Sequence, residues 1–130
     1  MFRALVVDDE RLARDRIIAL LEQDDDITVI GECGSGTEAI QQINRQKPDI
    51  VFLDIEIPDA DAFEVLEAID SDIHPFIIFV TAYVKYLKQQ KPIDDMTCLL
   101  KPFNAGRFQQ VINSVKKRLN TNNDAIRLKL

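Results

Sequence analysis

The sequence predicts a doubly wound α/β fold with a five-stranded parallel sheet, and three observations lead to this prediction. Short apolar runs alternate with amphipathic stretches along most of the chain, as in successive β-α-β units. Two of the runs, IVFLD at 50–54 and FIIFV at 76–80, are apolar almost throughout, which suits strands covered on both faces. Polar residues follow the runs and mark the carboxyl ends of the predicted strands.

The first half of the chain contains three predicted strands and two predicted helices. In order they are strand 2–7, helix 11–22, strand 27–33, a helix ending near 46, and strand 50–54. The first helix is indicated by apolar residues at helical spacing from Ala13 to Leu21. Ser35 and Glu38 have the spacing of a capping box and predict the start of the second helix. Pro48 ends that helix.

The second half of the chain repeats the alternation. In order the predicted elements are helix 62–69, strand 76–80, a weak helix at 84–91, strand 98–100, and a last helix to about 119. Asn104 is placed to cap the last helix. Residues 120–130 begin with a polar stretch and end with apolar residues at every second position, which predicts a linker and the start of an absent output domain.

Composition limits the classes of function. The 130 residues fit one domain, and 46% of them are hydrophobic, as in ordinary globular proteins. The net charge of −6 argues against direct nucleic-acid binding by this segment, because phosphate contacts need a basic face. No apolar run is long enough to cross a membrane. Cys33 and Cys98 match no metal or disulfide pattern, so we expect reduced thiols in a cytoplasmic protein.

Five polar residues are expected at one edge of the predicted sheet, where ligands of such folds bind. They follow the strands in the order Asp8, Asp9, Asp54, Thr81 and Lys101. Crowded carboxylates repel one another, and Mg²⁺ relieves this repulsion while keeping waters and phosphate oxygens as ligands. A carboxylate can attack phosphorus, and a lysine, a metal and a hydroxyl can stabilise the transferred group. The pattern therefore predicts a phosphorylated carboxylate, Asp54, in a Mg²⁺ pocket.

Four motifs in order resemble the receiver domain of two-component response regulators, and most closely receivers that precede LytTR-type DNA-binding domains. They are VVDDE at 6–10, IVFLDIEIP at 50–58, FVTAY at 79–83 and LLKPF at 99–103. The resemblance covers about residues 2–119 and implies a receiver domain at 1–119. It also implies the flavodoxin-like (βα)5 fold, with strand order 2-1-3-4-5 in the sheet.

The resemblance gives each residue of the predicted pocket a role. It makes Asp54 the phosphoacceptor, Asp9 a direct Mg²⁺ ligand, Asp8 a mostly water-mediated ligand, Glu56 a ligand through its backbone carbonyl, Thr81 the switch hydroxyl and Lys101 the phosphate-binding cation. It also implies a cis peptide between Lys101 and Pro102.

The resemblance further implies a phosphorylation-dependent signalling switch whose partner is a sensor histidine kinase. A homodimer would form through the fourth helix, the fifth strand and the last helix. The chain would catalyse only its own phosphotransfer and slow dephosphorylation, without being an enzyme for other substrates. A C-terminal DNA-binding domain would carry the transcriptional output.

The sequence departs from the family pattern at three places, one of which is the segment 84–97, where Lys91-Pro92 stands where a helix of the family usually continues. Receivers often read P-G-x-D-G after the acceptor loop, whereas residues 58–62 are PDADA, so both glycines that favour positive φ are absent. Cys98 stands where the family usually has an aromatic residue three positions before the lysine. We therefore expect a muted switch signal at that position.

The same residues allow other interpretations. Asp8 and Asp9 could simply cap the first helix, and Thr81 suits any strand. The sequence D-I-E at 54–56 faintly resembles the DxD motif of haloacid-dehalogenase phosphatases, which have it on their first strand. A third alternative is an unphosphorylated interaction module. The joint placement of all the pocket residues favours the receiver.

Overall fold

The computed structural model describes residues 1–82 and 98–129, and only the backbone of residues 122–129. The chain forms two compact units, Met1–Thr81 and Ala82–Leu130, and each is described by itself. The predicted helix at 84–91 lies outside the described residues.

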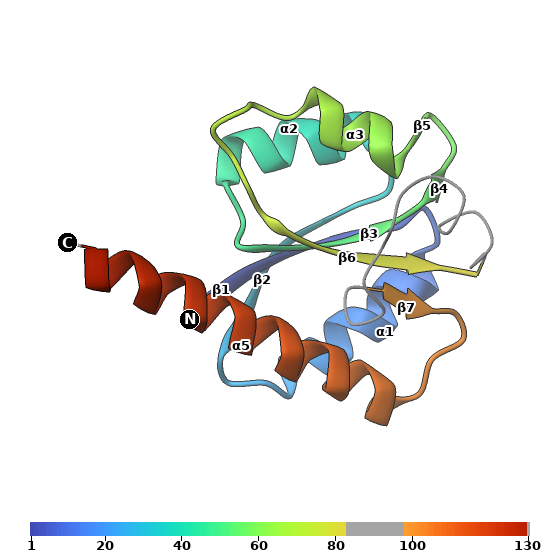
Figure 1. Cartoon of the computed structure of the whole chain (residues 1–130). Helices are drawn as coiled ribbons and strands as arrows, with labels where there is room; N and C mark the ends of the chain where they lie inside the picture. The colour runs from blue at the N-terminus through green and yellow to red at the C-terminus, as the bar shows by residue number, and fades with distance from the viewer. Residues whose placement is uncertain (83–97, 130) are drawn as a thin grey trace. The chain divides into compact units, whose positions relative to one another are not determined.

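The first unit is an α/β sandwich around a parallel sheet (Figure 1). Its elements are β1 Phe2–Val7, α1 Arg11–Glu22, β2 Ile27–Cys33, α2 Gly36–Gln46, β3 Ile50–Asp54, β4 Glu56–Ile57, β5 Ala60–Asp61, α3 Ala62–Ala68 and β6 Phe76–Thr81. Helices α2 and α3 lie side by side on one face of the sheet, and α1 lies on the other (Figure 1). Every strand predicted for this part of the chain is present.

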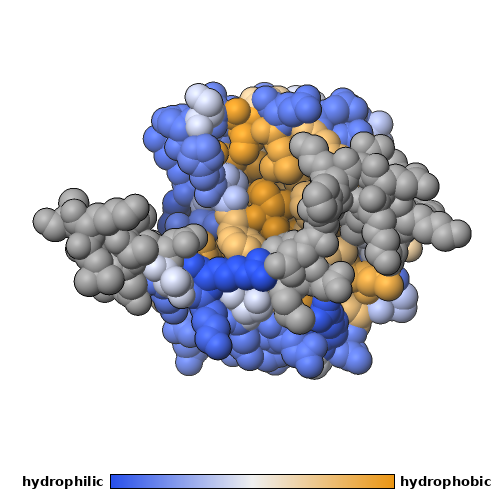
Figure 2. All heavy atoms as spheres, in the orientation of Figure 1, coloured by the Kyte–Doolittle hydropathy of each residue, from blue (hydrophilic) through white to orange (hydrophobic). Residues whose placement is uncertain are grey.

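The strands of the main sheet in this unit run in the order β2-β1-β3-β6, and all their pairings are parallel. All five residues of β3 are buried, as its apolar sequence predicted. Phe52 of β3, Leu5 of β1 and Ile78 of β6 have no exposed surface. They belong to a core covered by helices on both faces. In Figure 2, hydrophilic residues lie along the upper edge of the molecule, above α3. Hydrophobic residues gather below them, towards β6.

Capping residues set the ends of α2 and α3. Ser35 accepts a hydrogen bond from the Glu38 N–H at 3.2 Å, so the predicted cap of α2 is confirmed. At the other end, Lys47 adopts a left-handed conformation with φ 49°, immediately before Pro48. Asp61 caps α3 by accepting from the Glu64 N–H at 2.9 Å.

The N-terminus of α1 differs from the cap that Asp8 and Asp9 could have formed. Its N-cap residue is Glu10, which makes no side-chain capping bond. The Asp8 side chain instead accepts a hydrogen bond from the Glu10 N–H at 2.9 Å, outside the helix. Glu10, and neither Asp8 nor Asp9, therefore occupies the N-cap position of α1.

The second unit contains β7 Cys98–Leu100 and α5 Ala105–Lys129. Asn104 caps α5 by accepting from the Arg107 N–H at 2.7 Å, and the peptide between Lys101 and Pro102 is cis, as predicted. Helix α5 continues through residues 120–129, beyond the predicted end of the last helix near residue 119. The polar residues there include neither glycine nor proline, and nothing in the local sequence ends the helix. A linker role for this segment stays a prediction.

Candidate functional site

Three carboxylates meet where β1 and β3 end. Val7 of β1 pairs with Leu53 of β3, so the next residues, Asp8 after β1 and Asp54 at the end of β3, lie side by side. Oxygen atoms of Asp8, Asp9 and Asp54 all lie within 4.8 Å of one another. Asp8 is fully buried, Asp54 is 7% exposed, and Asp9 is exposed. The parallel register thus assembles an acidic cluster with one side open to solvent.

The donor set of this cluster fits a hard divalent cation. Like charges at this separation repel strongly, especially where burial lowers the effective dielectric constant. A bound cation would relieve the repulsion. All the candidate donors are oxygens, which Mg²⁺ prefers, and the exposed Asp9 leaves room for the waters that Mg²⁺ usually retains.

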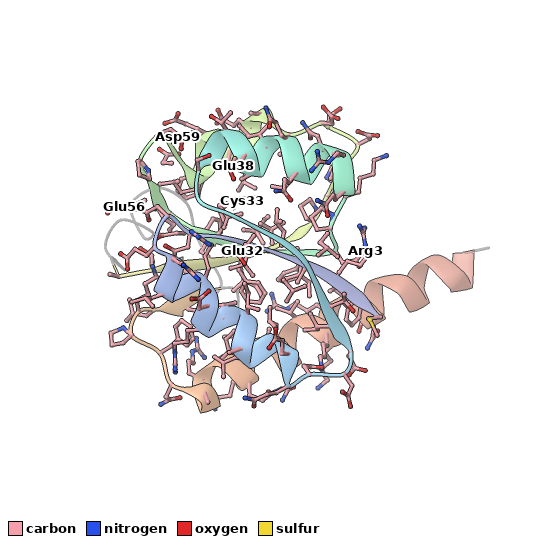
Figure 3. All side chains as sticks on the ribbon, turned by 180° about the vertical axis from the view of Figure 1, so that it is seen from behind. Arg3, Glu32, Cys33, Glu38, Glu56 and Asp59 are labelled. Carbon is pink, nitrogen blue, oxygen red and sulfur yellow. The ribbon has the colours of Figure 1, made fainter. Side chains whose placement is uncertain are left out.

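Local hydrogen bonds orient the Asp54 carboxylate. Asp54 accepts from the Glu56 N–H at 3.1 Å, and this contact ties the carboxylate to the loop that follows it. Glu56 lies in β4, with its side chain exposed (Figure 3). Its backbone carbonyl as a cation ligand stays a prediction.

Thr81 is the last residue of β6 and is 1% exposed. It follows Val80, which pairs with Asp54 in the neighbouring strand β3, so the hydroxyl-bearing residue lies one position beyond the level of Asp54. Lys101 follows β7, and the half-buried Cys98 begins that strand. Both belong to the second unit, and the phosphate-binding role of Lys101 and the altered switch position of Cys98 stay predictions.

The loop after Asp54 contains a small hairpin that the sequence did not predict. Strands β4 and β5 pair antiparallel, Glu56 with Asp61 and Ile57 with Ala60. Among the described residues only Lys47 is a non-glycine with positive φ. The loop therefore forms without the backbone conformations that the family's two glycines allow.

Asp59, at the turn of this hairpin, fastens the loop to α2. Its carboxylate accepts from the Gly36 N–H at 2.7 Å, from the Thr37 N–H at 3.0 Å and from the Thr37 hydroxyl at 2.8 Å. Figure 3 shows Asp59 at the end of the unit where α2 begins. A Cβ on Gly36 would lie 2.9 Å from the Cβ of Ala60, so this approach requires a glycine.

The hydrogen bonds from Gly36 and Thr37 lower the pKa of the Asp59 carboxyl from 3.8 to about 2. Because the folded-state pKa is lower than the unfolded one, the contribution to stability is complete above about pH 4 and is lost as the pH falls towards 2. We expect Asp59→Asn to lower the urea midpoint at pH 6, and the difference from wild type to shrink as the pH is lowered to 3. An exposed loop carboxylate provides the control, Asp25→Asn, which should leave the midpoint nearly unchanged. A difference that stays constant with pH would contradict this assignment.

Cys33 is a core residue. It is 1% exposed at the end of β2, and burial, followed by the charge of Glu38, raises the pKa of its thiol to about 11. The thiol therefore stays protonated at neutral pH, which fits its interpretation as a small packing residue.

Comparisons with known proteins agree with this geometry. Residues 4–113 match the model of the response regulator receiver domain. The chain is 40% identical over 119 residues to the sensory transduction protein LytT of Bacillus anthracis, a match that covers 91% of this chain and 48% of LytT. It is 34% identical over 117 residues to the transcriptional regulatory protein BtsR of Salmonella typhi, covering 90% of this chain and 49% of BtsR. The chain thus spans about half the length of these curated relatives.

A solved structure supports the same fold. The receiver domain of AraT, a response regulator from Geobacillus stearothermophilus, superposes with a TM-score of 0.81 at 25% identity, covering 94% of this chain and 98% of that one. The predicted flavodoxin-like fold is thereby confirmed. Within the described residues, no helix has the length and apolar character needed to span a membrane. The chain belongs to the response regulator receiver domain family.

Proposed function

We propose that this receiver domain is a switch that accepts a phosphoryl group from a sensor histidine kinase on Asp54. The observation that carries the proposal is the cluster of three carboxylates at the ends of two adjacent parallel strands. Asp54 is the member of this cluster that lies in the centre of the sheet, between β1 and β6. In the neighbouring strand β6, Asp54 pairs with Val80, and Thr81 is the next residue.

In the proposed reaction a carboxylate oxygen of Asp54 attacks the phosphorus atom of a phosphohistidine. A phosphorus–oxygen bond forms and the phosphorus–nitrogen bond breaks, with its electron pair passing to the imidazole nitrogen. The ring, protonated on its other nitrogen, leaves neutral. The hydrogen bond from the Glu56 N–H holds the attacking group in place.

The remaining residues act on the transferred group. Asp9 and Asp54 would hold Mg²⁺ directly, with Asp8 acting through water and Glu56 through its carbonyl. Mg²⁺ would supply positive charge to the phosphoryl oxygens during transfer. The Thr81 hydroxyl would donate a hydrogen bond to one phosphoryl oxygen, and the Lys101 ammonium would neutralise another. Since these contacts exist only with phosphate, they would favour a second conformation of the domain.

We further propose that the domain works within a longer protein, as the receiver part of a transcriptional regulator. Support comes from the relative named as a transcriptional regulatory protein, of which this chain covers 49%. A separate DNA-binding domain would provide the basic surface that a chain of net charge −6 lacks. Part of the proposed homodimer face, around residues 84–97, lies outside the described residues.

A phosphatase acting on other substrates is the alternative of a different class. Its DxD motif belongs on the first strand, whereas Asp54 ends β3. The position of the acceptor therefore favours a domain that catalyses only its own phosphorylation and dephosphorylation.

One measurement tests the proposal against its alternatives. The protein is incubated with acetyl phosphate and Mg²⁺, and its intact mass is measured. We expect a gain of one phosphoryl group, with no gain in the presence of EDTA. Steady hydrolysis of p-nitrophenyl phosphate would instead favour the phosphatase. A protein that gains no mass and hydrolyses nothing would be an unphosphorylated interaction module.

A further inference from the structure

Arg14 joins α1 to the turn that carries two of the carboxylates. Its Nη1 donates a hydrogen bond to the backbone carbonyl of Asp8 at 2.6 Å. Its Nε donates to the Glu32 side chain on β2 at 2.8 Å, and the Arg14 side chain is 16% exposed. Figure 3 shows Glu32 on β2 beside α1. One guanidinium thus bridges the acidic turn and β2.

The main chain of Asp8 is held at both its polar groups. Its N–H donates to the Cys33 carbonyl of β2 at 3.1 Å, and its carbonyl accepts from Arg14. The Asp8 carbonyl and the Asp9 N–H belong to one planar peptide group. An interaction that fixes this carbonyl therefore also fixes the direction in which the chain enters Asp9.

Arg14 adds a contact to a turn in which the N-cap side chain makes no capping bond. A side-chain cap often orders the start of a helix, but Glu10, the N-cap of α1, makes no such bond. Arg14 lies one turn into the same helix and contacts the turn from there. A planar guanidinium can make two directed hydrogen bonds at once, which an ammonium group cannot do in the same geometry.

We propose that Arg14 is a positioning residue for the divalent-cation site, which holds the Asp8–Asp9 turn in its ligand-presenting conformation and is itself oriented by Glu32. The inference rests on the proposed function, because it concerns cation binding at the same cluster. Groups that orient metal ligands without touching the metal commonly change its affinity about 10- to 100-fold when removed.

Charge and geometry predict opposite effects at this position. Arg14 is a cation beside a cation site, so its charge alone would weaken binding of Mg²⁺. If Arg14 acted only through its charge, Arg14→Gln would bind the cation more tightly than wild type. If Arg14 positions the ligands, the same substitution binds the cation more weakly. The sign of the change separates the two roles.

The experiment measures binding of Mn²⁺ to the full chain by electron paramagnetic resonance, with Mg²⁺ as competitor. We expect Arg14→Gln to bind roughly 10-fold more weakly. Arg14→Lys should fall between wild type and Arg14→Gln, because it keeps the charge but loses the paired geometry. Arg11→Gln is the matched control: this arginine is on the same helix, 83% exposed and paired only loosely with Asp15 at 3.7 Å, and its replacement should leave affinity nearly unchanged.

A second variant keeps the test valid if Arg14→Gln does not fold, as judged by circular dichroism without metal. Glu32→Gln leaves the arginine in place, loosens its anchor and removes one negative charge, so we expect a loss of affinity smaller than that of Arg14→Gln. The double variant Arg14→Gln/Glu32→Gln restores the net charge and should bind as weakly as Arg14→Gln if that variant folds.

Unchanged or tighter binding in Arg14→Gln, or wild-type affinity in the double variant, would overturn the positioning role. If Arg14→Gln does not fold, unchanged affinity in Glu32→Gln would overturn it. A wild-type protein that binds neither cation would overturn the metal site of the proposed function instead.

Discussion

Asp54→Asn should abolish the gain of one phosphoryl group from acetyl phosphate while leaving the fold intact. The substitution is nearly isosteric and removes the negative oxygen that would attack phosphorus. The asparagine oxygen can still accept from the Glu56 N–H, so the turn after β3 keeps its contact. It also removes one charge from a cluster whose oxygens lie within 4.8 Å, and the metal-free variant should therefore melt no lower than wild type.

The measurement is intact mass after reaction, followed by peptide mapping of the labelled site. Asp15→Asn is the control, because Asp15 is an exposed carboxylate of α1 outside the cluster, and that variant should be labelled like wild type. Labelling of Asp54→Asn at a different carboxylate would show that the acceptor has been misassigned. A variant that unfolds would show that Asp54 has a structural role beyond the one described.

The fold was predictable because its signals are local. IVFLD and FIIFV are apolar almost throughout, and every residue of the first is buried. The Ser35–Glu38 spacing located the start of α2 from two residues three positions apart. Asp8 and Asp54 could be brought together from sequence because each directly follows or ends a predicted strand, and parallel strands end at the same edge.

The contacts that hold the site in place were not predictable, because they join distant parts of the chain. Asp59 bonds to Gly36 across 23 positions, and Arg14 bonds to Glu32 across 18. No spacing rule for a helix or hairpin relates such pairs. Their partners are backbone N–H and C=O groups as often as side chains. Nearly every residue has these backbone groups, so the sequence does not show which of them will form such a bond.

The continuation of α5 illustrates the opposite failure, where a local signal was present and misleading. Ile126, Leu128 and Leu130 alternate as in a strand. So short an alternating pattern gives little preference for a strand. A helix that has already formed upstream is extended more easily, because each added residue gains one hydrogen bond. The Thr121 hydroxyl donates to the Lys117 carbonyl at 2.8 Å, within that continuous helix.

Asp9→Ala should remove the stabilisation of this domain by Mg²⁺ and, without metal, leave it at least as stable as wild type. A ligand that binds only the folded state raises the free energy of unfolding by about 2.7 kcal/mol at a concentration 100 times its Kd. Asp9 is the exposed member of the cluster, so truncating its side chain creates no cavity. It also relieves part of the repulsion on the buried Asp8 and Asp54.

The melting temperatures of wild type and Asp9→Ala, plotted against Mg²⁺ concentration, should therefore diverge as Mg²⁺ is added. In EDTA the variant melts at or above the wild-type temperature, and in saturating Mg²⁺ it melts below it. Asp15→Ala, which removes an equal charge from the exposed face of α1, should shift with Mg²⁺ as wild type does. An equal Mg²⁺ shift in Asp9→Ala and wild type would mean that the cation binds elsewhere. If Asp9→Ala were less stable than wild type in EDTA, the Asp9 side chain would stabilise the metal-free fold, contrary to the expected repulsion.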